Sequence, residues 1–166
     1  MKKSNVVAQF AEHVRAYKRW VLSGKASGAN AARQLLALIV DLYRQALVLP
    51  PAEHLKGGHK TLVTQKKRKF MMSKRIRLPF EYYSEVFDPL PVPPETPVVG
   101  SLSFDDIPCI YHDLVEKGLS LYDRGYTNDA IWEWKFSLQT HWGEHATSAI
   151  RALHCWLAKN DAFGID

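Results

Sequence analysis

The chain has 166 residues, of which 46% are hydrophobic and 23% are charged. That length fits one domain that can bury a core without disulfide bonds, and the composition excludes a chain that is disordered throughout. The formal net charge of +5 is unevenly spread, because residues 54–78 hold nine Lys and Arg and no acid, whereas residues 79–166 hold five basic and fourteen acidic residues. A basic character confined to one segment argues against a nucleic-acid-binding surface over the whole fold.

No targeting or membrane signal is visible in the sequence. The N-terminal residues include charged side chains where a signal peptide has an apolar run. The most apolar stretch, residues 35–49, is too short to span a bilayer and contains Asp41 and Arg44. The two cysteines, Cys109 and Cys155, lie far apart and suit a reducing compartment. We therefore expect a cytoplasmic protein without a cofactor.

Apolar residues at three- and four-residue spacing predict two helices in the first third of the chain. The first covers residues 5–23 and ends before Gly24. The second begins at a cap formed by Ser27 or Asn30 and ends near residue 49, before two prolines.

The middle of the chain is less regular. Residues 52–78 show no clean period and are interpreted as a basic irregular insertion. A short helix is predicted over residues 80–90. Five of the nine prolines fall between residues 89 and 97, so residues 89–100 are expected to form a stiff, extended connector.

Two further helices are predicted in the last third. One starts at Ser103, whose hydroxyl can cap the free N–H groups, and closes at Gly125. The other starts at Thr127 or Asn128 and runs without interruption to about residue 159. The whole pattern predicts an all-α, single-domain bundle over residues 1–166, with about four main helices and a long C-terminal helix.

The sharpest catalytic pattern is His141-x-x-Glu144-His145. Histidines four residues apart share one helix face and can hold a zinc ion, while the glutamate acts as base, which would make the protein a metal-dependent hydrolase. A catalytic zinc site needs a third protein ligand, for which the sequence offers His112, His154 or Glu133. The competing interpretation, which the helical phase favours, places both histidines in the tryptophan-lined stripe, bonded to backbone or carboxylate. There they fix packing between helices or shape a buried polar site.

The basic segment suggests a nucleic-acid-associated protein as a second alternative. Lysine and arginine neutralise phosphates, and an interleaved Phe70 can stack on a base. The opposing interpretations are a solvated loop, or a segment that folds onto the acidic half of the chain. The residues concerned, within the segment 60–77, are Lys66, Lys67, Arg68, Lys69, Lys74, Arg75 and Arg77.

The lead hypothesis is a non-enzymatic protein-binding domain of immunity, adaptor or regulatory type. It follows from an incomplete catalytic set and from the concentration of aromatic residues in the C-terminal helix. Gly118 and Trp134 also stand at the spacing of a helical hairpin with a small-residue contact. The partner is expected to be another protein, the oligomeric state is left open, and the candidate binding residues are Trp132, Glu133, Phe136, His141, Trp142 and His145.

Several short motifs spread over the chain carry a resemblance to a known family. They are Leu49-Pro50, Val86-Phe87-Asp88-Pro89-Leu90, Pro97-Val98-Val99-Gly100-Ser101-Leu102, Asp105-Asp106-Ile107, Ile110-Tyr111-His112-Asp113-Leu114, Trp132-Glu133-Trp134 and Thr140-His141-Trp142-Gly143-x-His145-Ala146. With these motifs the chain resembles a bacterial family of uncharacterised helical domains. The resemblance covers most of the chain except the basic segment. It implies a helical fold and no particular activity.

Overall fold

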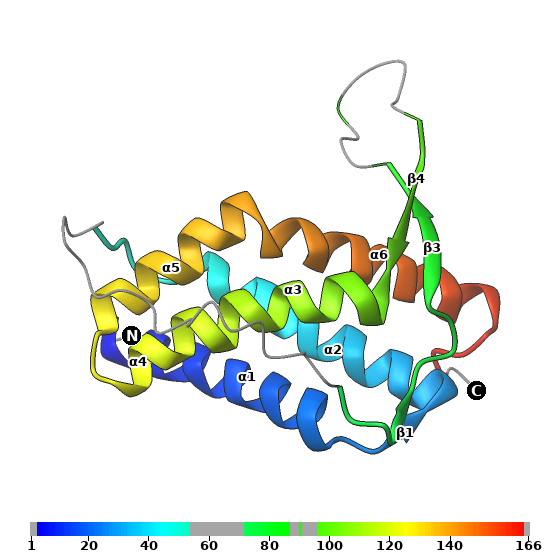
Figure 1. Cartoon of the computed structure of the whole chain (residues 1–166), viewed down its shortest axis with the longest axis horizontal. Helices are drawn as coiled ribbons and strands as arrows, with labels where there is room; N and C mark the ends of the chain where they lie inside the picture. Colours follow the sequence, from blue (N-terminus) through cyan, green and yellow to red (C-terminus); the bar gives the residue numbers. More distant parts are fainter. Residues whose placement is uncertain (1–2, 54–71, 87–89, 91–95, 165–166) are drawn as a thin grey trace.

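The computed structural model describes residues 3–53, 72–86, 90 and 96–164 (Figure 1). Two long antiparallel helices open the chain, α1 over Lys3–Ser23 and α2 over Gly28–Leu47. Their buried side chains recur at helical spacing, among them Phe10, Tyr17 and Leu35. Both helices are therefore confirmed close to their predicted bounds. Most of the predicted basic insertion lies outside the described residues.

One helical run crosses the middle of the bundle from Leu102 to Asp123 (Figure 1). Its cap lies two residues before the predicted one, because the Ser101 hydroxyl, and not that of Ser103, accepts a hydrogen bond from the Phe104 backbone N–H. Glycine at position 125, with φ of 86°, follows its end. The run alternates between wide and ordinary helical turns: π-helix η1 (Leu102–Asp106), α3 (Ile107–Tyr111), π-helix η2 (His112–Leu119) and α4 (Ser120–Asp123).

The predicted long C-terminal helix is interrupted. Helix α5 spans Thr127–Thr140 and α6 spans Trp142–Lys159, with non-helical dihedral angles at His141 (φ −157°, ψ −79°). Gly143 lies directly after the break, where a Cβ atom would overlap the Leu138 carbonyl oxygen. The expectation of one continuous helix is therefore wrong. The apolar residues keep their helical period on both sides of His141, so the sequence pattern does not reveal a break at this single residue.

Residues predicted as a short helix over 80–90 instead contain a strand. Strand β3 (Tyr82–Glu85) pairs antiparallel with β4 (Val98–Ser101), so part of the predicted connector is also a strand. In this register Tyr83 faces Gly100, over which its ring packs. The pair extends away from the bundle (Figure 1). A second, two-residue pairing joins β1 (Ala26–Ser27) to β2 (Ile76–Arg77) in parallel.

The core lies between the helices and confirms the all-α, single-domain class. Its largest fully buried side chains include Trp134 and Trp142. Trp134 packs into the space left by Gly118 and donates from its indole to the Leu114 carbonyl oxygen at 3.0 Å, which is the small-residue helix contact expected from the sequence. Among the described residues, no helix has both the length and the apolar character needed to cross a membrane.

Candidate metal centre

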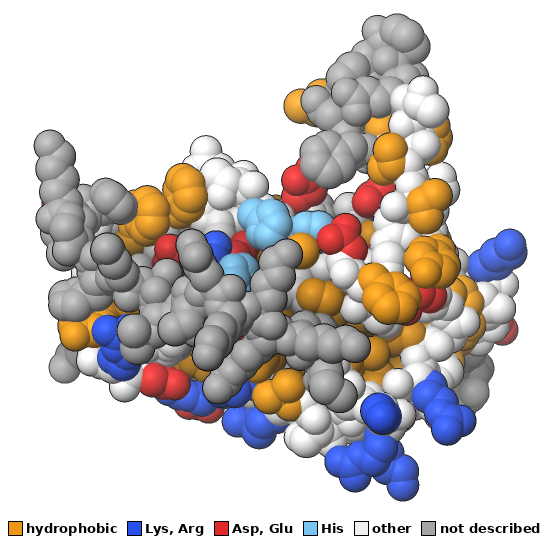
Figure 2. Space-filling model, in the orientation of Figure 1, with side chains coloured by type: hydrophobic (Ala, Val, Ile, Leu, Met, Phe, Trp, Pro, Cys, Tyr) orange, Lys and Arg blue, Asp and Glu red, His pale blue; other side chains and the backbone are white. Residues whose placement is uncertain are grey.

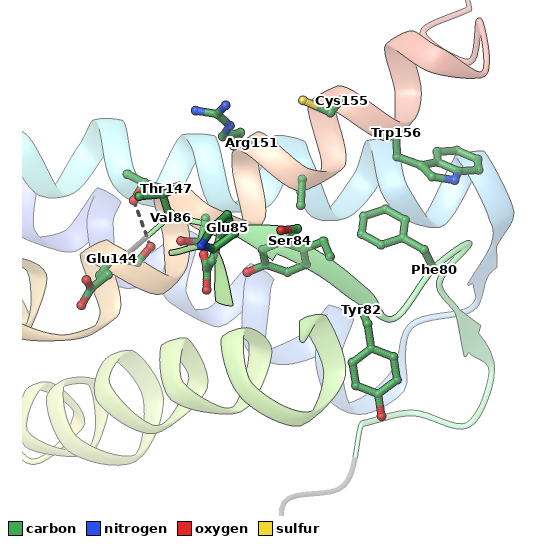
Figure 3. A pocket seen from close by; sticks show the side chains of 14 residues that line it. Phe80, Tyr82, Ser84, Glu85, Val86, Glu144, Thr147, Arg151, Cys155 and Trp156 are labelled. Atoms are coloured by element: carbon green, nitrogen blue, oxygen red, sulfur yellow. Dashed lines mark hydrogen bonds between the residues drawn. The ribbon is translucent and has the colours of Figure 1, made fainter. Parts of the chain in front are cut away.

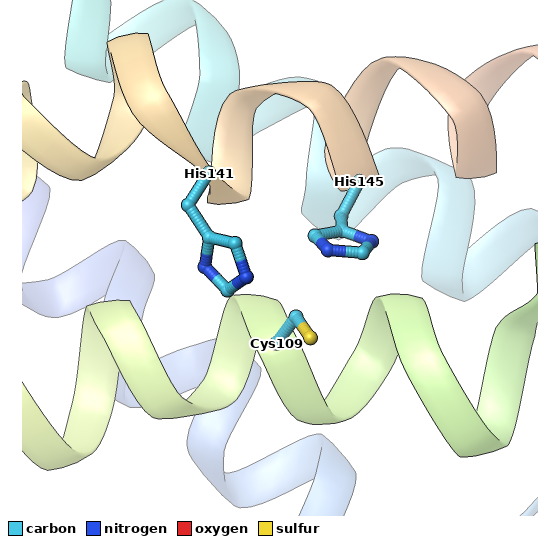
Figure 4. Close-up of side chains that lie close together, drawn as sticks. All are labelled: Cys109, His141 and His145. Atoms are coloured by element: carbon cyan, nitrogen blue, oxygen red, sulfur yellow. The ribbon is translucent and has the colours of Figure 1, made fainter. Parts of the chain in front are cut away.

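The middle helical run directs a row of polar groups at the break between α5 and α6. Asp106 closes η1, Cys109 lies in α3 and Asp113 lies in η2. These residues follow one another at three- and four-residue intervals, so they share one side of the run. Both His141, at the break, and His145, in the first turns of α6, face this row (Figure 4).

Three potential metal ligands come together at this junction. One ligand atom from each of Cys109, His141 and His145 lies within 4.8 Å of the other two. Figure 4 shows the two imidazole rings above Cys109, one from the break and one from α6. The rings meet edge to face, with their centroids 5.0 Å apart. Imidazole nitrogen and thiolate sulfur are both donors that zinc accepts, and a set of two imidazoles and one thiolate also suits copper.

Each of these imidazoles is hydrogen-bonded to its own buried carboxylate. His141 Nδ1 lies 2.7 Å from Asp113 Oδ2, and His145 Nδ1 lies 3.1 Å from Asp106 Oδ1. Among the residues described, these two aspartates are the only buried carboxylates. When the carboxylate is ionised it only accepts, so the paired ring then donates from Nδ1 and keeps Nε2 for another partner. Such a carboxylate–histidine pair fixes the ring orientation and raises the basicity of a metal ligand.

The buried carboxylates are in turn held by further polar groups. The Tyr83 hydroxyl donates to Asp106 Oδ2 at 2.7 Å. Lys117 Nζ lies 2.8 Å from Asp113 Oδ1 and 3.4 Å from a Glu133 oxygen. The two carboxylates are thus compensated by a phenol, an ammonium and two imidazoles, as buried charges in folded proteins must be.

The surroundings also change the acidity of the groups at the centre. Burial lowers the pKa of His145, but hydrogen bonds to Asp106 and Cys109 outweigh it and raise this pKa to about 10. Burial and the bond to Asp106 raise the pKa of Tyr83 far above its ordinary value, so its hydroxyl keeps the proton that it donates. Without a metal ion, a cationic imidazolium therefore lies between carboxylates and a thiol.

The centre is open to solvent on one side. The His141 side chain is 45% exposed, whereas that of His145 is 18% exposed. Figure 2 shows the pale blue histidines beside red carboxylates at the surface near the middle of this face. Asp105 stands at the rim, with one oxygen 3.6 Å from Cys109 Sγ and the other 3.9 Å from His145 Nδ1. The two histidines do not lie in an apolar stripe, because the break turns them toward this polar row, where each is bonded to a carboxylate.

None of the three residues proposed as a third ligand belongs to the centre. His112 pairs with Glu116 at 2.8 Å, the His154 ring lies against Phe163, and Glu133 contacts Lys117. Glu144, expected to act as base, lines a neighbouring cavity and is not part of the ligand group.

The remaining predicted binding residues are separated from one another. Trp142 is fully buried and donates to the Trp134 carbonyl oxygen, so it belongs to the core. Trp132 and Phe136 stack with their ring centroids 4.8 Å apart on another side of α5.

The nucleic-acid alternative falls mainly on residues that the structure does not describe. Lys66, Lys67, Arg68 and Lys69 lie outside the described residues. The described Arg75 donates to the Ser23 carbonyl oxygen at 2.7 Å and so ties β2 to the end of α1. Nucleic-acid binding by this segment stays a prediction.

Sequence reasoning missed Cys109, Asp106 and Asp113. A signal was present, because the spacing of these three residues places a thiol between two carboxylates on one helix side. Their relation to His141 and His145, however, depends on how the middle run crosses the α5–α6 junction.

The sequence profile of the family described as Domain of unknown function (DUF5063) matches residues 1–159. The chain therefore belongs to this family. Comparison with curated proteins and with solved structures found no match.

Proposed function

We propose that this member of a family of unknown function binds a divalent transition metal ion, with zinc as the best match, through Cys109, His141 and His145. The observation that carries the proposal is the pairing of both histidines with the buried carboxylates Asp113 and Asp106. Burying a carboxylate is costly, and here both buried carboxylates orient imidazole rings toward the same thiol.

Among the described residues the ligand group has three members, and this count favours a reactive centre over a purely structural one. Structural zinc sites use four protein ligands, whereas catalytic sites use three and leave a position for water or substrate. The exposed side of His141 gives access to that position. A zinc ion there would lower the pKa of bound water to about 7 and polarise a carbonyl or phosphoryl group. Metal-dependent hydrolysis is therefore the reaction class that we propose, with Asp105, and not Glu144, as the nearest exposed carboxylate.

The proposal is tested by titrating the metal-free protein with zinc against a competing chelator. We expect one zinc per chain, with affinity reduced at least 100-fold in Cys109→Ser, His141→Ala and His145→Ala. Cys155→Ser and His112→Ala are matched controls, since neither residue belongs to the ligand group. Cobalt substituted for zinc should show a thiolate absorption band that Cys109→Ser removes and Cys155→Ser keeps.

Two of these ligands, Cys109 and His145, also form with Asp106 a thiol–imidazole–carboxylate arrangement, in the order Cys109, His145, Asp106. If zinc affinity is equal in the wild type and all three ligand variants, the metal proposal fails. Rapid alkylation of Cys109 that depends on His145 and is unaffected by zinc would then identify a nucleophilic cysteine.

A second candidate function is protein binding through the side of α5 that carries Trp132 and Phe136. The observation that favours it is their stacked pair, in which Phe136 is 49% exposed. Capture of a partner by the wild type, but not by Phe136→Ser, would support it. Equal capture by both proteins would exclude this surface.

A further inference from the structure

A cavity of about 660 Å³ lies between strand β3 and helix α6 (Figure 3). Its size is within the range of small-molecule sites. Residues 82–86 form one wall and α6 forms the other. Tyr83 lines the cavity and donates from its hydroxyl to Asp106, which is also hydrogen-bonded to His145 of the candidate metal centre.

The two ends of the cavity differ in chemistry. At one end Phe80 and Trp156 stack with their ring centroids 6.2 Å apart. Glu144 lies three turns away along α6, which corresponds to roughly 18 Å at the helical rise. Glu85 lies at the corresponding end of β3, so the cavity has an aromatic end and a carboxylate end, as Figure 3 shows.

The Glu85 carboxylate indicates that the carboxylate end of the cavity lacks a hydrogen-bond donor. Its Oε2 atom is buried and has no hydrogen-bond partner among the described residues. A buried acceptor without a donor costs free energy, and more so when it is charged. A donor for this oxygen can come from a molecule bound in the cavity that Glu85 lines.

The charge around the cavity specifies the donor further. Glu85 and Glu144 line it, while Asp105 and Asp106 lie behind Tyr83. The basic lining residue, Arg151, is exposed and points away from Glu85 in Figure 3. An ammonium group supplies both the missing N–H donors and the opposite charge.

We propose that this cavity binds a protonated amine with an elongated apolar body, its ammonium group on Glu85 and its body extending along the cavity toward the aromatic end formed by Phe80 and Trp156. This site is distinct from the metal centre, and its occupancy does not depend on a bound metal.

Three probes of the same shape test the proposal by calorimetry on the full chain: 4-phenylbutylamine, 4-phenylbutan-1-ol and 4-phenylbutanoate. We expect the amine to bind one per chain and at least tenfold more tightly than the alcohol, with the carboxylate weakest. The titration is repeated in the presence of a chelator, where the affinity for the amine should be unchanged. The titration with chelator distinguishes the cavity from the metal centre, because removal of zinc should not change the affinity for the amine.

Glu85→Gln keeps the shape of the side chain and should remove the preference for the amine over the alcohol. Glu53→Gln is the matched control, because Glu53 is exposed and does not line the cavity. Ala152→Leu, which fills the cavity without changing charge, should weaken all three probes and serves as a second test if Glu85→Gln does not fold. Equal binding of amine and alcohol, tighter binding of the carboxylate, no binding at millimolar concentration, or an unchanged amine preference in folded Glu85→Gln would each overturn the proposal.

Discussion

The Asp113 carboxylate is fully buried and makes two charged contacts, with His141 Nδ1 and with Lys117 Nζ. Its charge is what makes the His141 ring a better ligand, since an amide would hold the ring without raising its basicity. We therefore expect Asp113→Asn to weaken zinc binding by roughly 10- to 100-fold, as second-layer substitutions at metal sites do. Competitive titration measures the effect.

Asp41→Asn serves as the control for that variant, because Asp41 is half exposed and pairs only with Arg44 on the surface of α2. Its zinc affinity should equal that of the wild type. An Asp113→Asn protein that is folded by circular dichroism and binds zinc normally would show that Asp113 supports the fold and not the ligand.

The two neighbouring tyrosines of β3 provide a second comparison at the residue scale. Tyr83 donates to the buried Asp106, whereas Tyr82 is 64% exposed. Tyr83→Phe leaves a buried carboxylate oxygen without its donor, which should lower the free energy of unfolding by about 1–3 kcal/mol. Tyr82→Phe should change it by less than about 0.5 kcal/mol. Urea denaturation of both variants measures these free energies of unfolding, and equal stabilities would contradict the role given to Tyr83.

At the scale of elements, the break between α5 and α6 determines where His141 lies. Gly143 makes the break possible, because an added Cβ atom would overlap the Leu138 carbonyl oxygen, which belongs to the backbone and cannot rotate away. Gly143→Ala should therefore destabilise the protein by about 1–3 kcal/mol and also displace His141. We expect zinc affinity to fall in this variant even under conditions where it is fully folded.

Gly118→Ala is the matched control, since it overpacks the core against the Trp134 ring but lies away from the break. It should reduce stability while leaving zinc affinity closer to that of the wild type. If both glycine variants lose stability and neither loses zinc affinity, the geometry of the break does not determine the metal centre.

The helices were predictable wherever a face repeats over several turns. The stripes of α1 and α2 consist of many apolar residues, so their bounds follow from the sequence. The break at His141 was not predictable from the sequence. Only His141 and Gly143 mark it, and the apolar period continues on both sides. Strand β3 was mistaken for helix because it is stabilised by its pairing with β4, a contact between segments that lie apart in the chain.

The candidate site shows the same limit. The pair His141 and His145 could be identified from spacing alone, since both lie in one short motif. Cys109 could not be assigned as the third ligand, because its distance to the histidines depends on the packing of α3 against α6. Local patterns therefore located two of the three ligands, and tertiary packing supplied the third.

At the scale of the whole molecule, metal binding should appear as stability. A ligand that binds only the folded state stabilises it by about 2.7 kcal/mol at 100 times its dissociation constant. For a chain of this length that corresponds to a rise in melting temperature of roughly 5–10 °C. Differential scanning calorimetry with and without zinc measures the shift. His145→Ala should show none, and an equal shift in that variant would indicate binding elsewhere.

The position of the three ligands along the chain has a consequence for folding. Cys109 and His141 are separated by roughly thirty residues, and a bond to a shared ion would close that segment into a loop in any state that retains the ion. Such a crosslink removes conformations from the unfolded chain, in the way that a disulfide does, but it can be reversed by a chelator. Amide hydrogens of α3 and α6 should then exchange together with solvent, and a chelator would allow the two helices to open separately.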